Sequence, residues 1–482
     1  MGKSRFYIIF AENTRPMKIK TFSLSALLAI ATFSLNAAPF AIDGIYYELS
    51  GNSQSECYVT FPSETEAQYK GTIDIPAEIE ADGKVLKVSG IGQYAFSNCT
   101  ELTGIKLPES IEYIGRNAFS RCVFLSEISL PDGIEEINEQ TFYNCCSLER
   151  IEFGLNLKSI GNNAFAKCSV LNEINLPEAL KFIGDGAFRE CSSLNRVEIP
   201  EGATEISPMA FQGCVSLCDV TLPSGLQTIT DYCFDGCSSL ENIELPASLT
   251  SIGERAFGAC VSLENIELPE SLTRIDRSAF ELCVSLSRLD INNESIELGD
   301  YAFSGCSSLT DVVLNGVTSL GRGCFMNCTA LDRIYFSEVM KRIDNQCFQN
   351  CMNISLVYCP ADLPPALANT AFEDITYKNA LLSVSEGLAL LYMQTPPWSY
   401  FLNVYAPDSG VEDVMAENLH LIKDGKSIRI DGLQGSATYE VYSLDGRLLE
   451  SGAISEGEVV ELNASGVYMI RVGGRCWKVS GK

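Results

Sequence analysis

The sequence predicts a repeat solenoid, mainly β, with a long parallel sheet and a small β-sandwich at its C-terminal end. Phenylalanine returns every 23 residues over nine successive steps, a cysteine follows each one three residues later, and a leucine usually follows three residues after that. A unit of 23 residues is too small to bury its own apolar side chains, so neighbouring units must stack and share one core. The phenylalanines in strict register are Phe96, Phe119, Phe142, Phe165, Phe188, Phe211, Phe234, Phe257, Phe280 and Phe303.

Each unit also contains a stretch of alternating apolar and polar residues, which is typical of a short β-strand. Stacking these strands in register builds a parallel sheet with a spacing of about 4.8 Å. A proline follows many of the strands, such as Pro108 and Pro131, and removes the donor that would continue the ladder. A second apolar pair, such as Ile111 and Ile114, then leads back to the next phenylalanine.

Twelve of the twenty cysteines occupy one position of the repeat, which favours buried thiols that fill volume over a disulfide framework. Cys233, Cys324 and Cys347 stand where other units have alanine, which supports the same interpretation. Disulfides between Cys324 and Cys347, or between Cys328 and Cys351, remain an alternative, because adjacent coils fit disulfide geometry. The structural ladder is expected to include Phe96, Cys99, Phe119, Cys122, Phe165, Cys168, Phe188, Cys191, Phe257 and Cys260.

The repeat over residues 90–376 resembles the BspA-like, or treponemal-type, class of leucine-rich repeat. It shares the pattern Cys-x-x-Leu-x-x-Ile-x-Leu-Pro-x-x-Ile-x-x-Ile-Gly-x-x-Ala-Phe. The resemblance implies a right-handed leucine-rich-repeat coil, preceded by an N-terminal β cap at residues 38–89 with a hairpin in 71–88. It also implies an exported bacterial surface protein, and some members of the class bind host matrix proteins or other bacteria.

The amino-acid composition argues against several classes of function. The chain has 62 acidic and 34 basic residues and a net charge of −28, which disfavours binding to nucleic acid or to anionic lipid. His420 is the single histidine, so imidazole-based metal sites and catalytic triads are poor candidates. We therefore expect no cofactor, no metal and no enzymatic activity.

The first residues read as a signal peptide, predicted at residues 1–37 with a true start at Met17 as one possibility. Lys18 and Lys20 precede a mostly apolar run at 21–35, and Ala37 and Ala38 supply small residues for cleavage. No later apolar run reaches the roughly 20 residues needed to span a bilayer. The mature chain is expected outside the cell or on the outer surface of a bacterium, without membrane insertion.

The repeats end near Leu363, and a C-terminal cap is predicted at 377–405. The run from Leu381 to Val384 and the stretch from Trp398 to Phe401 together resemble the strand-and-tryptophan element that closes such arrays. A linker is predicted at 406–413. Alternating runs and the Asp445-Gly446 turn then predict a β-sandwich at 414–482. The stretches 441–446 and 466–472 resemble the sorting tail of Bacteroidetes type IX secretion, which implies export and surface attachment.

The outward side of the sheet is polar in most units and differs in the last three. There the outward positions are predicted to hold a partner-binding surface, because tyrosine and arginine often anchor interfaces. The residues proposed for it are Val313, Arg333, Tyr335, Leu356 and Tyr358. Two alternatives stay open: the C-terminal segment could cover these side chains, and the partner could be a glycan instead of a host matrix or bacterial surface protein. A purely structural envelope protein is a third function compatible with the sequence.

Overall fold

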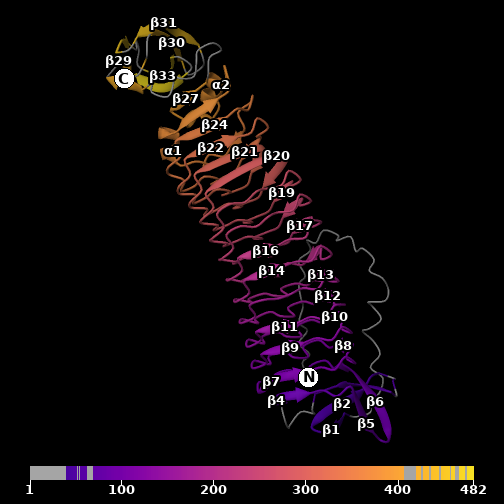
Figure 1. Ribbon diagram of the computed structural model, residues 1–482. Coiled ribbons are helices and arrows are strands. Elements are labelled where there is room, and N and C mark those ends of the chain that lie inside the picture. The colour runs from indigo at the N-terminus through magenta and orange to yellow at the C-terminus, as the bar shows by residue number, and fades with distance from the viewer. Residues whose placement is uncertain are drawn as a thin grey trace, which may run out of the picture.

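The computed structural model describes residues 39–406 and 420–481, apart from 52, 54, 62–68, 425–426, 432, 434–435, 444–446, 456, 462–465 and 473–474. Within these residues the chain winds into one long solenoid, with the N-terminal strands at one end and a group of strands from the tail at the other (Figure 1). The predicted mainly β solenoid is confirmed. The predicted signal peptide lies outside the described residues, as does the predicted linker except for Ala406.

The solenoid has two parallel ladders. The first, from the predicted alternating strands, comprises β4 (Gly71–Asp74), β7 (Leu102–Lys106), β9 (Glu127–Ser129), β11 (Arg150–Glu152), β14 (Arg196–Glu198), β16 (Asp219–Thr221), β20 (Arg288–Leu298), β21 (Asp311–Leu320), β22 (Arg333–Phe336) and β24 (Leu356–Cys359). Most paired neighbours are 23 residues apart, as in Ile128 with Ile151, whereas β21 and β22 pair 22 residues apart. Around residues 173–175, 242–244 and 265–267 the coils stack without a regular strand.

The second ladder comes from the second apolar pair of each unit. Its short strands are β8 (Tyr113–Ile114), β10 (Glu136–Ile137), β12 (Ser159–Ile160), β13 (Phe182–Ile183), β15 (Glu205–Ile206), β17 (Thr228–Ile229), β18 (Ser251–Ile252), β19 (Arg274–Ile275), β23 (Arg342–Ile343) and β25 (Ala366–Leu367). β20 and β21 are long enough to belong to both ladders. Asn292 and Asn315 stand where earlier coils have the strand-ending proline, so these two strands continue.

The core is a column of phenylalanine rings. From Phe96 to Phe348, successive rings lie 5.1–5.6 Å apart and within 10° of parallel, and each side chain is fully buried. Tyr69 continues the column at the N-terminal end, and Phe372 continues it at the other. Every coil thus contributes one ring to a continuous apolar core, as the repeat predicted.

The cysteine column lies beside the rings and does more than fill space. The column consists of the cysteines that follow each phenylalanine by three residues. From Cys122 to Cys351, each thiol of this column donates a hydrogen bond to the carbonyl of the phenylalanine in the preceding coil, with Sγ···O distances of 3.0–3.4 Å. Among these, Cys191 bonds to Phe165 at 3.2 Å. All twenty cysteines are free thiols, so the alternative of disulfides at Cys324–Cys347 or Cys328–Cys351 is wrong.

The N-terminal segment covers the first coil. β1 (Phe40–Ile42), β2 (Ile45–Leu49) and β3 (Glu56–Val59) form an antiparallel run that reaches β6 (Lys84–Ile91). β6 forms a hairpin with β5 (Glu78–Ala81) and also pairs in parallel with β8. The segment therefore extends the second ladder, while β4 extends the first ladder through its pairing with β7.

The C-terminal residues after the last repeat continue the first ladder with β26 (Leu381–Val384) and β27 (Asn403–Tyr405). Between these strands lies α2 (Ala389–Gln394), and α1 (Asp374–Asn379) precedes β26. Trp398 belongs to a short 3₁₀ helix, η2 (Trp398–Tyr400), and not to a strand; it is fully buried and donates Nε1–H to the Pro365 carbonyl at 2.7 Å. The buried indole closes the apolar core behind the last coils.

The tail contains β28 (His420–Asp424), β29 (Ser427–Asp431), β30 (Ser436–Ser443), β31 (Leu448–Ser455), β32 (Val459–Glu461), β33 (Gly466–Val472) and β34 (Arg475–Gly481). They form two sheets around a small apolar cluster of their own that includes Ile430 and Ile470. β34 pairs antiparallel with β27, so the tail is attached to the last strand of the solenoid. The β-sandwich itself stays a prediction.

Truncating one ring of the core column should destabilise the solenoid. For Phe211→Ala we expect a loss of about 3–5 kcal/mol of unfolding free energy, because the cavity lies between two stacked coils that cannot collapse onto it. Leu155 is 72% exposed, and Leu155→Ala should change stability by less than about 0.5 kcal/mol. Urea denaturation followed by circular dichroism checks both variants. Equal midpoints for the two would contradict the proposed role of the column.

Candidate functional site

The five residues predicted for partner binding lie on one face at the C-terminal end of the first ladder. Val313 on β21, Tyr335 on β22 and Tyr358 on β24 are register neighbours across three strands. Arg333 and Leu356 form the adjacent pair. Between them, Ile334 and Val357 point into the core and are fully buried, so strand alternation alone turns the five side chains outward.

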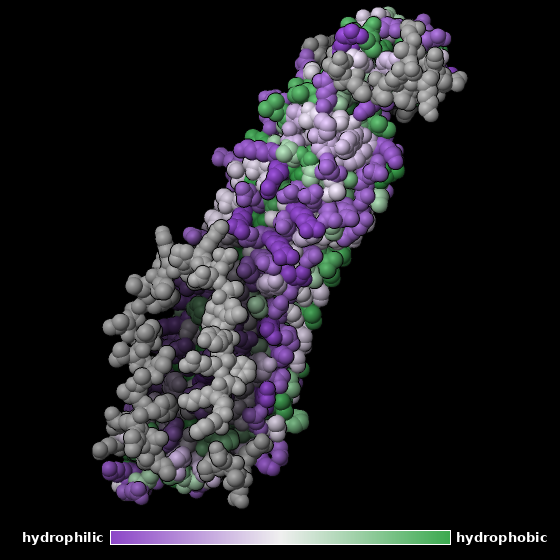
Figure 2. All heavy atoms as spheres, turned by 180° about the vertical axis from the view of Figure 1, so that it is seen from behind, coloured by the Kyte–Doolittle hydropathy of each residue, from purple (hydrophilic) through white to green (hydrophobic). Residues whose placement is uncertain are grey.

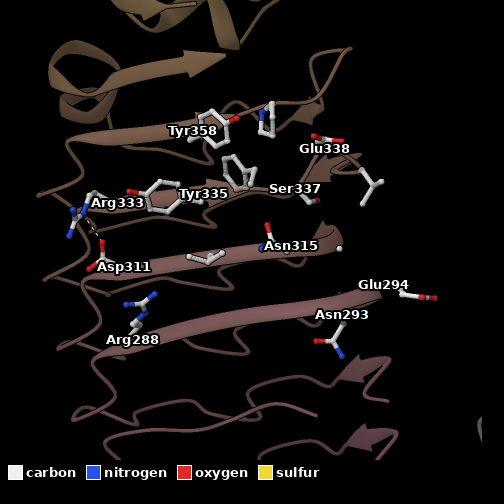
Figure 3. Close-up of a pocket in the computed structure, with 15 residues that line it drawn as sticks. Arg288, Asn293, Glu294, Asp311, Asn315, Arg333, Tyr335, Ser337, Glu338 and Tyr358 are labelled. Atoms are coloured by element: carbon white, nitrogen blue, oxygen red, sulfur yellow. Dashed lines mark ion pairs between the residues drawn. The ribbon is translucent and has the colours of Figure 1, made fainter. Parts of the chain in front are cut away.

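A groove of about 760 Å³ opens on this face, and four of the five residues line it (Figure 3). Leu356 is not among its lining residues. The other lining residues come from the ends of the same strands and from the turns after them: Arg288, Asn293, Glu294, Asp311, Asn315, Gly316, Phe336, Ser337, Glu338, Val339 and Pro360. This volume lies within the range of ordinary ligand-binding clefts.

The groove lies where the repeat loses its strand-ending proline. Asn292, Asn315 and Ser337 occupy that position in three successive coils, and the long strands β20 and β21 form there. Asn315 donates its Nδ2–H to Asn292 Oδ1 at 2.9 Å, which ties two of these coils together. Sequence reasoning identified the tyrosines but missed the groove, although the interruption of the Leu-Pro pattern was a visible signal.

The rim of the groove at β20 and β21 is held in place by buried contacts. Asn293 is 5% exposed, and its Nδ2 donates to the carbonyls of Pro269, Glu270 and Leu272 at 2.8–3.1 Å. Gly316 has a φ of +74°, and a Cβ there would overlap the Asn293 carbonyl oxygen. The rim is therefore preorganised, because its backbone cannot shift without breaking these contacts.

The two arginines of the groove are each matched by an aspartate. Arg333 Nε lies 2.6 Å from Asp311 Oδ1, and Arg288 Nε donates to Asp290 Oδ2 at 2.8 Å. These hydrogen bonds raise the pKa of both guanidinium groups, which remain charged. The pairing fixes the orientation of the arginines and cancels most of their positive charge.

The aromatic part of the groove remains open. Tyr358 is 37% exposed, and the Tyr335 and Tyr358 ring centroids are 6.3 Å apart with planes tilted by 54°. Among the described residues, Tyr358 is exposed and Tyr335 is partly buried, so the described part of the C-terminal segment does not cover both rings. That the five residues bind a partner stays a prediction.

The rest of this face is polar. Each short strand of the ladder buries its central residue and exposes the two flanking residues, as in Arg150 and Glu152 around Ile151. Over the middle of the molecule, one side is covered mainly by hydrophilic residues (Figure 2). A second hollow of about 450 Å³ around Glu127, Glu149 and Glu173 is strongly acidic. Such a surface is typical of a solvated solenoid face.

The buried thiols are poor nucleophiles and poor metal ligands. Burial raises the pKa of the Cys99 thiol to about 11 and that of Cys214 and Cys306 to about 12. The reactive form of cysteine is the thiolate, which these sites disfavour. Within the described residues no group of three or more His, Cys, Asp or Glu side chains is arranged to hold a metal ion. No helix there has the length and apolar character needed to cross a membrane.

Comparison with known proteins gives the same fold. The model of the BspA type leucine-rich repeat region matches residues 86–184, 158–283 and 227–355, which together make up more than half of the chain. A solved leucine-rich repeat protein from Bacteroides ovatus is 28% identical over 77% of this chain and 90% of that one, with a TM-score of 0.62. No curated protein matches.

Two further solved structures are similar at lower TM-scores. A leucine-rich cell surface protein from Faecalibacterium prausnitzii is 24% identical, over 78% of this chain and 96% of that one, with a TM-score of 0.42. A leucine-rich repeat protein of T. pallidum is 30% identical, over 45% of this chain and 87% of that one, with a TM-score of 0.33.

Alkylation should distinguish the thiols by exposure. In the folded chain at pH 8, iodoacetamide should modify exposed Cys218 first, half-buried Cys146 more slowly, and the eighteen buried cysteines only after denaturation. Peptide mapping by mass spectrometry checks the order. Rapid modification of Cys191 in the folded chain would contradict the structure.

The thiol column should also make the fold sensitive to alkaline pH. In the unfolded chain thiols ionise near pH 8.5, whereas the folded chain holds their protons to much higher pH. Stability is therefore fully present below about pH 8.5 and should fall as pH rises, by up to about 1.4 kcal/mol per thiol for each pH unit. Urea denaturation at pH 7.5, 9 and 10 measures how steeply stability falls with pH. Cys214→Ala should make this fall less steep by the contribution of one thiol proton. A midpoint that does not change with pH would rule the effect out.

Proposed function

This chain belongs to the BspA-type leucine-rich repeat family, and on that basis we propose that it is an exported, non-enzymatic protein-binding module of the bacterial cell surface. Its contact site is the groove formed by β20, β21, β22 and β24. Binding to a host matrix protein or to a surface protein of another bacterium would make it an adhesin.

The observation that carries the proposal is the composition of the groove. Tyr335, Tyr358 and Val313 provide apolar contact area on strands fixed by the core, and Arg333 is oriented by Asp311. Aromatic and arginine side chains on a rigid surface are the usual anchors of protein interfaces, because they lose little conformational entropy on binding. The groove has none of the imidazole or ionisable thiol groups that would support catalysis.

Glycan capture is a less favourable alternative. The tyrosine planes are tilted by 54° and do not form a flat platform for sugar rings. A purely structural role in the envelope would not account for the open aromatic side chains at one end of an otherwise polar face.

Export and surface attachment are supported by the two ends of the sequence. The basic and apolar segments of residues 17–35 resemble a signal peptide, and residues 441–446 and 466–472 resemble a type IX sorting tail. In this proposal the tail delivers the solenoid to the outer surface, and the solenoid provides the binding.

Removing both tyrosine rings should abolish most of the partner binding. For Tyr335→Ala combined with Tyr358→Ala we expect at least a tenfold loss of affinity, the scale of losing central aromatic contacts. The measurement is surface plasmon resonance of the full chain against panels of purified extracellular-matrix proteins, bacterial surface proteins and glycans.

Tyr113 is 40% exposed and lies far from the groove, so Tyr113→Ala is the matched control and should bind as the unchanged chain does. Binding of glycans alone would refute a protein-binding module. Unchanged protein binding by the double variant would place the contact site elsewhere on the solenoid.

A further inference from the structure

The groove has two ends of different charge. At one end Arg288 and Arg333 are matched by Asp290 and Asp311. At the other, Glu294 extends from the irregular part of β20 and Glu338 from the turn after β22 (Figure 3). Both glutamates are exposed, and within the described residues neither carboxylate has an ion-pair or hydrogen-bond partner. The groove therefore presents two unmatched negative charges on one rim.

The aromatic residues lie beside this acidic rim. Tyr335 and Tyr358 occupy the floor between the arginine end and the turns that hold Glu338 and Val339 (Figure 3). A lysine or arginine stem can pack along a tyrosine ring while its charged end reaches a carboxylate beyond it. An acidic ligand would instead meet two glutamates and arginines that are already neutralised.

The charge of the whole chain favours the same partner. A net charge of −28 attracts cationic segments over long range and repels anionic ones, which raises the rate of encounter with basic partners. Asn293 and Gly316 fix the part of β20 that carries Glu294, and the Ser337 hydroxyl, which donates to the Val317 carbonyl at 2.6 Å, fixes the start of the turn that carries Glu338. The backbone under both carboxylates therefore needs little ordering when a partner binds.

We propose that the groove recognises a basic segment of a partner protein, in which lysine or arginine side chains meet Glu294 and Glu338 and an adjacent apolar side chain packs on Tyr335 and Tyr358. This inference rests on the proposed protein-binding function and specifies the chemistry of the partner.

Short peptides provide a direct test. The probes are acetyl-Gly-Lys-Phe-Lys-Gly-amide, the same peptide with both lysines acetylated, and the same peptide with glutamate in place of lysine. Saturation-transfer-difference NMR with the full chain measures their binding. The lysine peptide should bind at least about fivefold more tightly than either of the others, and its affinity should fall between 50 and 300 mM salt.

Variants distinguish the effect of the two rim carboxylates from that of carboxylates elsewhere on the same face. Glu294→Gln with Glu338→Gln should weaken the binding of the lysine peptide about fivefold, the scale of losing two exposed ion pairs, and should reduce its salt dependence. Glu244→Gln with Glu267→Gln makes the same charge change on exposed residues of the same face outside the groove, and should leave binding unchanged. Circular dichroism should show all these variants folded, because every substituted side chain is exposed.

The outcomes distinguish this inference from the proposed function. Equal binding of the three peptides, preference for the glutamate peptide, absence of binding by the lysine peptide, or equal losses in the two glutamine pairs would overturn the basic-partner inference. The protein-binding groove would still stand if Tyr335→Ala with Tyr358→Ala weakens binding to a protein partner. If that tyrosine variant binds every protein and peptide unchanged, the groove assignment itself fails.

Discussion

The stacking of one phenylalanine ring from each coil on the ring of the next determines the geometry of the whole solenoid. Rings separated by 5.1–5.6 Å and almost parallel leave room for no other register, so every other residue of the unit is brought directly above its counterpart. The thiol-to-carbonyl hydrogen bonds add a polar constraint next to the rings: the Phe165 carbonyl, for example, accepts from the Cys168 N–H of its own coil and from the Cys191 thiol of the next coil.

Periodicity was sufficient to predict the inward side of the fold. Phe188 and Cys191 could be placed in the core because side chains that return at a fixed interval must share one environment. The hydrogen bond from each thiol could not be predicted, since it depends on a carbonyl 26 residues earlier in the chain. The helices α1 and α2 and the 3₁₀ turn at Trp398 were missed, because the residues after the last repeat have no counterpart for comparison.

The candidate site was predictable only in part, for the same reason. Tyr335 and Tyr358 could be assigned to the outward face by strand alternation. Glu294 lies in the part of β20 where the ladder register shifts, and Glu338 lies in the turn after β22. Which turns converge around one groove is a property of the folded coil, and no local pattern in the sequence encodes it.

The spacing of the coils also determines how long and how stiff the solenoid is. An extended chain of 23 residues would span roughly 76 Å, whereas one coil advances the solenoid by only about 5 Å. The solenoid exchanges length for stiffness, so it holds the groove and the N-terminal coils at a fixed separation, which a flexible tether would not do. Because the groove lies on the last coils, beside the tail, duplication of a single coil before β20 would move the N-terminal end away by one increment and leave the groove unaltered.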